Sequence, residues 1–210
     1  MQGPATTIEQ FWSILKSPSD TLSLVIKAHH SIEAKVHELL GETLPRASKV
    51  ELHRVSFLLK VDFLIGLGVL NPSLRHLYEL VNTARNRFAH NPYAEFTEED
   101  ATKIKNAVRS VDKNYPCAGD ANAILILLLH VVFDYSSRRY EQIIIHKLRE
   151  EAMQEMMSDR SWEAPHPSGI ELPPITDEML KEVRDEMEPE ILKRVKNKLS
   201  ERYPAIEVKS

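Results

Sequence analysis

An arginine, an asparagine and a histidine lie close together near the middle of the chain, and their side chains are of the kinds that act on phosphate groups. They are Arg85, Asn86 and His90, within the stretch 77–93. A guanidinium suits the negative charge that builds on phosphoryl oxygens, and an imidazole exchanges a proton near neutral pH. The amide of Asn86 can orient either group. This combination predicts binding or chemistry at a phosphodiester.

The same residue types allow a structural interpretation. His90 would then stabilise the C-terminal end of a helix, and Arg85 would pair with a carboxylate such as Glu51. Residue types alone leave both interpretations open.

These residues are expected late on one amphipathic helix. Its apolar positions recur at steps of three and four residues and predict a buried face: Leu74, Leu77 (or Tyr78), Val81, Ala84 and Phe88. Asn82, Asn86 and His90 are four residues apart and share another face. Pro92 ends the helix, because the residue before a proline is pushed out of the α region. Further candidate binding residues on and just after this helix are Asn82, Arg87, Asn91 and Tyr93.

The rest of the chain also favours helices, and we find no segment with strand alternation. Expected helices are 6–16, 20–40 with Gly41 as its stop, 48–65, 72–90, 98–111, 121–157 and 176–202. Thr97 to Asp100 resembles a capping box at the start of one of them. The predicted fold class is all-α, an up-and-down bundle of about five or six helices with a further C-terminal helix.

The predicted organisation has three parts. Residues 1–157 form the helical bundle, 158–175 a proline-rich linker, and 176–210 an amphipathic helix. The apolar side of that last helix fits either a partner protein or its own bundle, so a helical scaffold that recruits a partner is one functional hypothesis.

Composition narrows the function classes. The formal net charge is −4, which argues against bulk coating of nucleic acid but leaves room for a local basic site. Cys117 is the one cysteine, so no disulfide can form within the chain. The N-terminus has no signal-peptide pattern, and the longest apolar run, 123–133, is too short to cross a bilayer. We therefore expect a cytoplasmic protein without membrane attachment.

No metal or cofactor is expected. His29, His30 and His37 surround Glu33 at spacings that could bind a metal, but nothing nearby completes a tetrahedral set. A solvated histidine-bearing helix face is the favoured interpretation of these residues.

The central motif also carries a family resemblance. The pattern Arg85-Asn86-x3-His90, late on a helix in an α bundle, resembles the signature of the HEPN superfamily, many of whose members are metal-independent ribonucleases or ribonuclease toxins. The segment 63–71, Phe-Leu-Ile-Gly-Leu-Gly-Val-Leu-Asn, is similar to a stretch of the mannitol operon repressor family, a HEPN-like group, and 93–100 fits that group as well. The resemblance is clearest over 58–104.

The resemblance implies a mechanism and partners. Two protomers would pack with their motif helices facing each other around a shared cleft, as a homodimer. His90 would activate the ribose 2′-hydroxyl or protonate the leaving oxygen, Arg85 would stabilise the phosphorane, and Asn86 would hold the geometry. Such an endoribonuclease or RNA-binding protein would act in toxin, stress or defence systems, with an antitoxin or regulatory protein as a partner.

A different function remains open within the same resemblance. The relatives of the mannitol operon repressor type are regulators of transcription, so the chain could be a non-enzymatic regulator that acts through protein contacts. Ribonucleases of the superfamily often carry Tyr two residues after the histidine, whereas this chain has Pro92 there and Tyr93 one position later.

Overall fold

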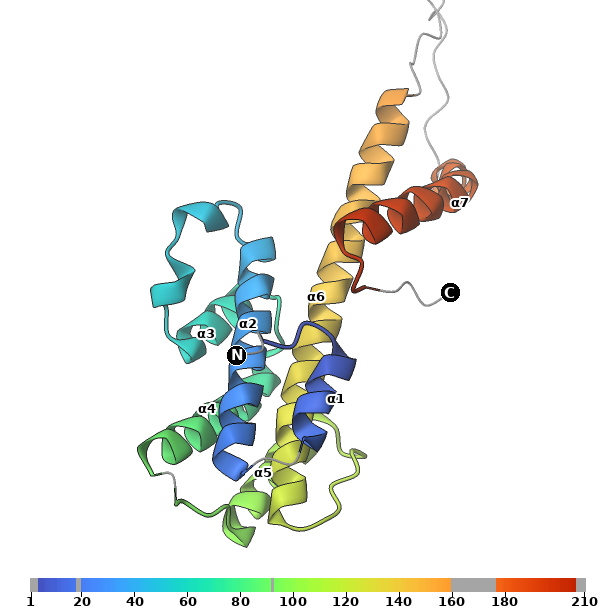
Figure 1. Ribbon diagram of the computed structural model, residues 1–210. Coiled ribbons are helices and arrows are strands. Elements are labelled where there is room, and N and C mark those ends of the chain that lie inside the picture. Colours follow the sequence, from blue (N-terminus) through green and yellow to red (C-terminus); the bar gives the residue numbers. More distant parts are fainter. Residues whose placement is uncertain (1–3, 18–19, 92, 160–176, 207–210) are drawn as a thin grey trace, which may run out of the picture. The chain divides into compact units, whose positions relative to one another are not determined.

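The described parts of the chain are mostly helical. The computed structural model describes residues 4–17, 20–91, 93–159 and 177–206 (Figure 1). The helices are α1 (Ile8–Lys16), α2 (Thr21–Thr43), α3 (Phe57–Gly66), α4 (Arg75–His90), α5 (Glu98–Val111), α6 (Ala121–Asp159) and α7 (Asp177–Arg202), with short 3₁₀ turns η1 (Ala47–Lys49), η2 (Leu52–Arg54) and η3 (Pro72–Leu74). No strand occurs within these residues. The all-α prediction is confirmed.

The chain divides into two compact units. They are Met1–Tyr140 and Glu141–Ser210, and the division falls inside α6. This differs from the bundle boundary at residue 157 that the sequence suggested, because the part of α6 after Tyr140 packs with α7. The expected linker 158–175 lies outside the described residues except for its first two positions.

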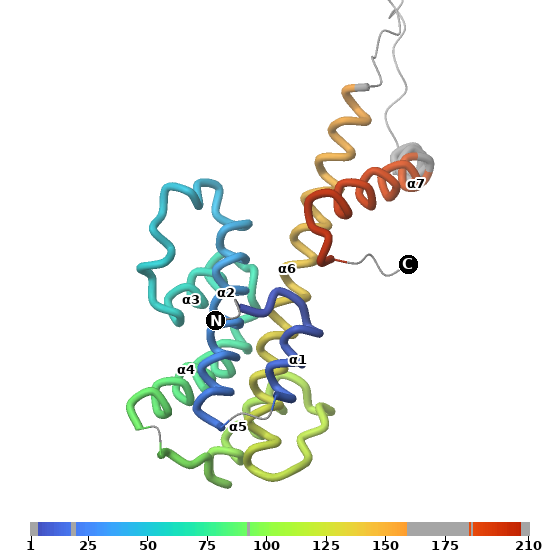
Figure 2. The backbone as a smooth tube through the Cα atoms, in the orientation of Figure 1, coloured from blue at the N-terminus to red at the C-terminus, as the bar shows by residue number. Residues whose placement is uncertain are grey.

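The first unit is built around α2. This helix packs against α1, α3 and α4, which lie around it in Figure 2. It buries side chains on more than one side, including Val25, Ile32, Val36 and Leu39. The predicted apolar face of α4 is buried as expected: Leu77, Val81, Ala84 and Phe88 are all at most 5% exposed.

The first part of α6 closes the other side of this core. Phe133 stacks on Phe11 of α1, with ring centroids 4.0 Å apart. Arg139 Nε donates to the carbonyl oxygen of Val69 over 2.7 Å. Before α6, Gly119 has φ 112°, and a Cβ there would lie 2.6 Å from Ala123 Cβ, so the turn into this helix requires glycine.

Tyr78 links α4 to α6 through a buried hydrogen bond, which gives a testable expectation. Its hydroxyl lies 2.8 Å from Ser136 Oγ, and burial raises the pKa of Tyr78 to about 12. Tyr78→Phe should lower the free energy of unfolding by about 1 kcal/mol, because Ser136 keeps only its bond to the Val132 carbonyl. Urea denaturation measures this. Tyr93→Phe is the control, since Tyr93 is 92% exposed and its change should have no effect on unfolding.

The second unit pairs the rest of α6 with α7. α7 crosses the later turns of α6 (Figure 1). The buried side chains of the two helices, among those that the structure describes, are Ile144, Leu148, Ala152 and Met156 of α6 and Met187, Ile191, Val195 and Leu199 of α7. Ion pairs join the two helices at Arg149–Glu188 and Arg202–Glu151, both 2.8 Å. Of the two predicted roles for the C-terminal helix, docking within its own chain accounts for this apolar side.

Two sequence expectations about helix limits are wrong. Gly41 does not stop α2, which continues to Thr43 because Leu39 and Leu40 are fully buried and hold its last turns in place. The helix expected over 48–65 begins only at Phe57. Before it the chain forms the short turns η1 and η2, and of the apolar residues Val50, Leu52 and Val55 only Leu52 is buried.

Candidate functional site

Helix α4 carries the three predicted catalytic residues in its last turns. Because its apolar positions are fixed in the core, the residues between them are directed away from it. Arg85 and His90 are exposed and Asn86 is half-buried. The predicted face of Asn82, Asn86 and His90 is therefore at least partly open to solvent.

Arg85 and Asn86 are joined by a hydrogen bond. Arg85 Nη1 donates to Asn86 Oδ1 over 3.0 Å. Among the described residues no carboxylate pairs with Arg85, and Glu51, the partner considered from the sequence, pairs with Arg54 instead at 2.8 Å. The guanidinium thus keeps an unneutralised charge and free donors at the surface, held in place by an amide.

His90 is the last residue of α4 and is exposed. Its side chain makes no hydrogen bond or ion pair within the described part of the chain, so the structure does not join it to Arg85. The helix end is capped by the backbone N–H of Asn91, which donates to the Arg87 carbonyl. The imidazole of His90 is thus available to a ligand or to a second copy.

The other predicted binding residues have different surroundings. Asn91 Oδ1 accepts from the backbone N–H of Tyr93 over 3.1 Å, which shapes the turn after α4. Tyr93 itself is 92% exposed. Asn82 lies one turn before Asn86 and is half-buried.

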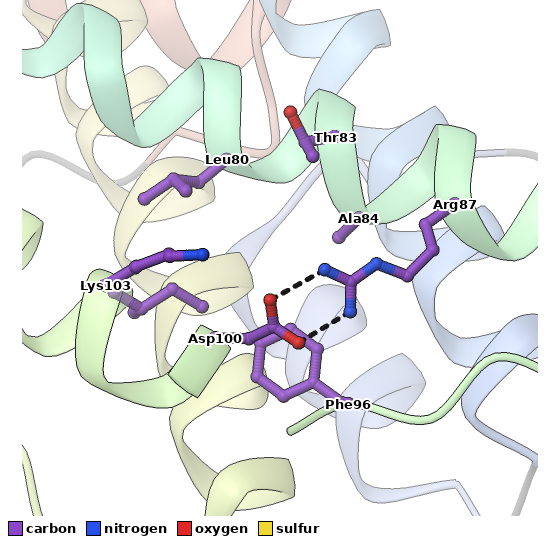
Figure 3. A pocket seen from close by; sticks show the side chains of 8 residues that line it. Leu80, Thr83, Ala84, Arg87, Phe96, Asp100 and Lys103 are labelled. Atoms are coloured by element: carbon purple, nitrogen blue, oxygen red, sulfur yellow. Dashed lines mark hydrogen bonds and ion pairs between the residues drawn. The ribbon is translucent and has the colours of Figure 1, made fainter. Parts of the chain in front are cut away.

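Arg87 faces α5 and has a structural partner. It holds both carboxylate oxygens of Asp100, each at 2.6 Å (Figure 3). The hydrogen bonds from Arg87 keep the pKa of Asp100 far below its usual range. Beside the pair is a hollow of about 30 Å³, lined in part by Leu80, Phe96 and Lys103, which has room for about one water molecule. Arg87 therefore joins α4 to α5 and has little capacity left for a ligand.

A buried histidine lies next to this site and was not predicted from the sequence. His29 of α2 is only 7% exposed, although a solvated face was expected for it. Burial lowers its pKa to about 4; Glu33 opposes this change, Arg85 adds to it, and the nearby amide of Asn82 opposes it. The signal was present: His29 follows Val25 by four residues and precedes Ile32 by three, so it lies in the buried register of α2.

His29 belongs to a group of polar side chains from three helices. Glu33 Oε2 lies 4.0 Å from His29 Nδ1, and Lys60 of α3 reaches Glu33 Oε1 at 2.8 Å. Burial raises the pKa of Glu33, but the hydrogen bond and the charge of Lys60 outweigh it and place the pKa below its ordinary value. His30 and His37 are exposed, as expected.

Within the described residues no three His, Cys, Asp or Glu side chains gather in a way that could hold a metal ion. No described helix has the length and hydropathy needed to cross a bilayer. No family model matches the chain, and no curated protein or solved structure matches it significantly. The chemistry of the Arg85 region is therefore the basis for assigning a function.

Proposed function

We propose that this chain is a homodimeric RNA-binding protein of the HEPN type that cleaves RNA without a metal ion. The observation that supports it is the state of Arg85: an exposed guanidinium, oriented by Asn86, with no carboxylate partner in the described residues. An arginine that only stabilises the fold is expected to be paired, as Arg87 is. An unpaired one suits a phosphate group.

The reaction follows from the three side chains. The ribose 2′-oxygen attacks the phosphorus and gives its proton to one neutral His90. Arg85 stabilises the phosphorane, the bond from phosphorus to the 5′-oxygen breaks, and a protonated His90 gives its proton to that oxygen. The products are a 2′,3′-cyclic phosphate and a 5′-hydroxyl. One His90 cannot hold both roles at once, so the second is supplied by a second copy.

Purified protein should cleave single-stranded RNA in the presence of EDTA. Arg85→Ala and His90→Ala should each lower the rate by about 100-fold, since each removes a group that acts in the transition state. His76→Ala is the matched control, because His76 is an exposed histidine near the start of the same helix and should not affect the rate. Gel analysis of labelled RNA, with identification of the cyclic phosphate end, measures both. Intact RNA, or equal loss in all three variants, contradicts the proposal.

A second candidate, a non-enzymatic regulator that works through protein contacts, is favoured by a different surface. Leu59, Phe63 and Leu67 are each 44–47% exposed and lie four residues apart along and just after α3. Such an apolar stripe is typical of a contact surface. The two candidates differ in cells: expression of a ribonuclease should slow growth and His90→Ala should relieve it, whereas a regulator should show neither effect.

A further inference from the structure

His29 has an unsatisfied nitrogen beside the Arg85 site. Nε2 is buried, and no hydrogen-bond partner for it exists within the described residues. Buried polar atoms normally have partners, so an orphaned ring nitrogen requires a reason. The groups that act on this imidazole are Glu33 and His30 on its own helix, Lys60 of α3 through Glu33, and Asn82 and Arg85 of α4.

The charges around the ring determine which nitrogen carries the proton in the resting protein. Glu33 lies on the Nδ1 side, at 4.0 Å, and its carboxylate is held ionised by Lys60. A carboxylate on that side favours the proton on Nδ1. Nε2 then bears a lone pair. A lone pair can accept a proton but cannot contact an anion until it has done so.

We propose that the buried His29 helps to bind a phosphate group at Arg85. When the phosphate binds, the imidazole takes up a proton and donates a hydrogen bond from Nε2 to a phosphate oxygen. This inference rests on the proposed function, since it needs a phosphate at Arg85. The negative charge of the phosphate offsets the repulsion that Arg85 exerts on a protonated ring. This contact requires the half-buried side chain of Asn82, which acts on the same ring, to rotate away from Nε2.

Binding should therefore take up a proton at His29. The probe is a short single-stranded deoxyoligonucleotide, which lacks the 2′-hydroxyl and cannot be cleaved, and whose diester phosphates do not titrate near neutral pH. Titration calorimetry in two buffers of different ionisation enthalpy, at about pH 5.5, should show an uptake of nearly one proton at this residue. Affinity should rise about tenfold from about pH 7.5 to 5.5, as expected when the pKa of the bound imidazole returns to its ordinary value.

Variants assign the proton. His29→Gln should remove the part of the proton uptake that is due to His29, and with it the tenfold rise in affinity. His30→Gln, the exposed neighbour on the same helix, should retain both. His90→Gln removes any proton taken up by the predicted catalytic histidine, so the share that remains belongs to the buried ring. Circular dichroism checks that each variant is folded.

If His29→Gln does not fold, NMR of the wild-type protein replaces it, and the imidazole resonance of His29 must titrate at a higher pH with oligonucleotide than without. Binding that depends on Arg85 but leaves the titration of His29 unchanged overturns this inference and spares the proposed function. A wild-type protein that binds no oligonucleotide at any pH overturns both.

Discussion

Asp100→Ala should lower the free energy of unfolding by about 2 kcal/mol. Asp100 has two roles: its carboxylate forms the bidentate pair with Arg87, and it accepts from the backbone N–H and hydroxyl of Thr97 in the capping box of α5. Loss of Asp100 leaves the half-buried guanidinium of Arg87 without its partner, which costs about 1 kcal/mol, and loss of the cap costs about 1 kcal/mol more. The side chain of Arg87 is 36% exposed, so solvent compensates part of the charge that this change leaves unpaired.

Glu99→Gln is the matched control for this prediction. Glu99 is the adjacent residue and pairs with Lys103 at 2.7 Å, but both side chains are more than half exposed. Exposed ion pairs contribute roughly 0–1 kcal/mol, so this change should be close to neutral. Asp100→Asn, which retains an acceptor for the cap, should lie between the two. Urea denaturation at neutral pH measures all three, and equal effects of Asp100→Ala and Glu99→Gln would refute the structural role of the Arg87 pair.

The second prediction concerns pH. The folded protein holds His29 neutral until the pH falls to about 4, whereas an exposed histidine binds a proton below about 6.5. Its contribution to stability is therefore complete above pH 6.5 and is lost as the pH falls from 6.5 to 4. At about 1.36 kcal/mol per pH unit, this loss amounts to about 3 kcal/mol.

Other groups also lose stability in acid, so the test compares proteins. Glu33 and Asp100 have lowered pKa values and contribute their own losses as the pH falls. The difference in unfolding free energy between wild type and His29→Gln isolates the histidine and should shrink by about 3 kcal/mol between pH 7.5 and pH 4. The corresponding difference for His30→Gln should stay constant. If the difference for His29→Gln also stays constant across this range, the buried neutral state of His29 is incorrect.

Local signals were sufficient for much of the fold. The buried face of α4 follows from three- and four-residue spacing, and the start of α5 follows from the capping box at Thr97. Such features depend on neighbours within about one turn of helix, so the sequence determines them directly. The Arg85–Asn86 bond is of the same kind, because the two residues are adjacent.

The features that were not predicted depend on residues far apart in the chain. Arg87 was a candidate for ligand binding, because no residue near it in sequence indicates an ion-pair partner. Its partner, Asp100, lies thirteen residues later in the chain. The cluster around His29 joins three helices, and no local pattern states which helices will meet. The apolar register of His29 does indicate burial, but its histidine neighbours favoured a solvated face. The boundary near Tyr140 was missed because α6 continues through it without a break.

The two-helix second unit has a practical consequence for shortening the protein. A truncation placed at the proline-rich stretch, where composition suggests a natural end, would remove α7 and keep the α6 residues that it covers. The truncated helix would then expose a continuous apolar surface to water, made up of Ile144, Leu148, Ala152 and Met156. Such surfaces favour self-association. A truncation close to Tyr140 removes these apolar residues together with α7. Any attempt to isolate the Arg85 region is therefore better ended inside the long helix than after it.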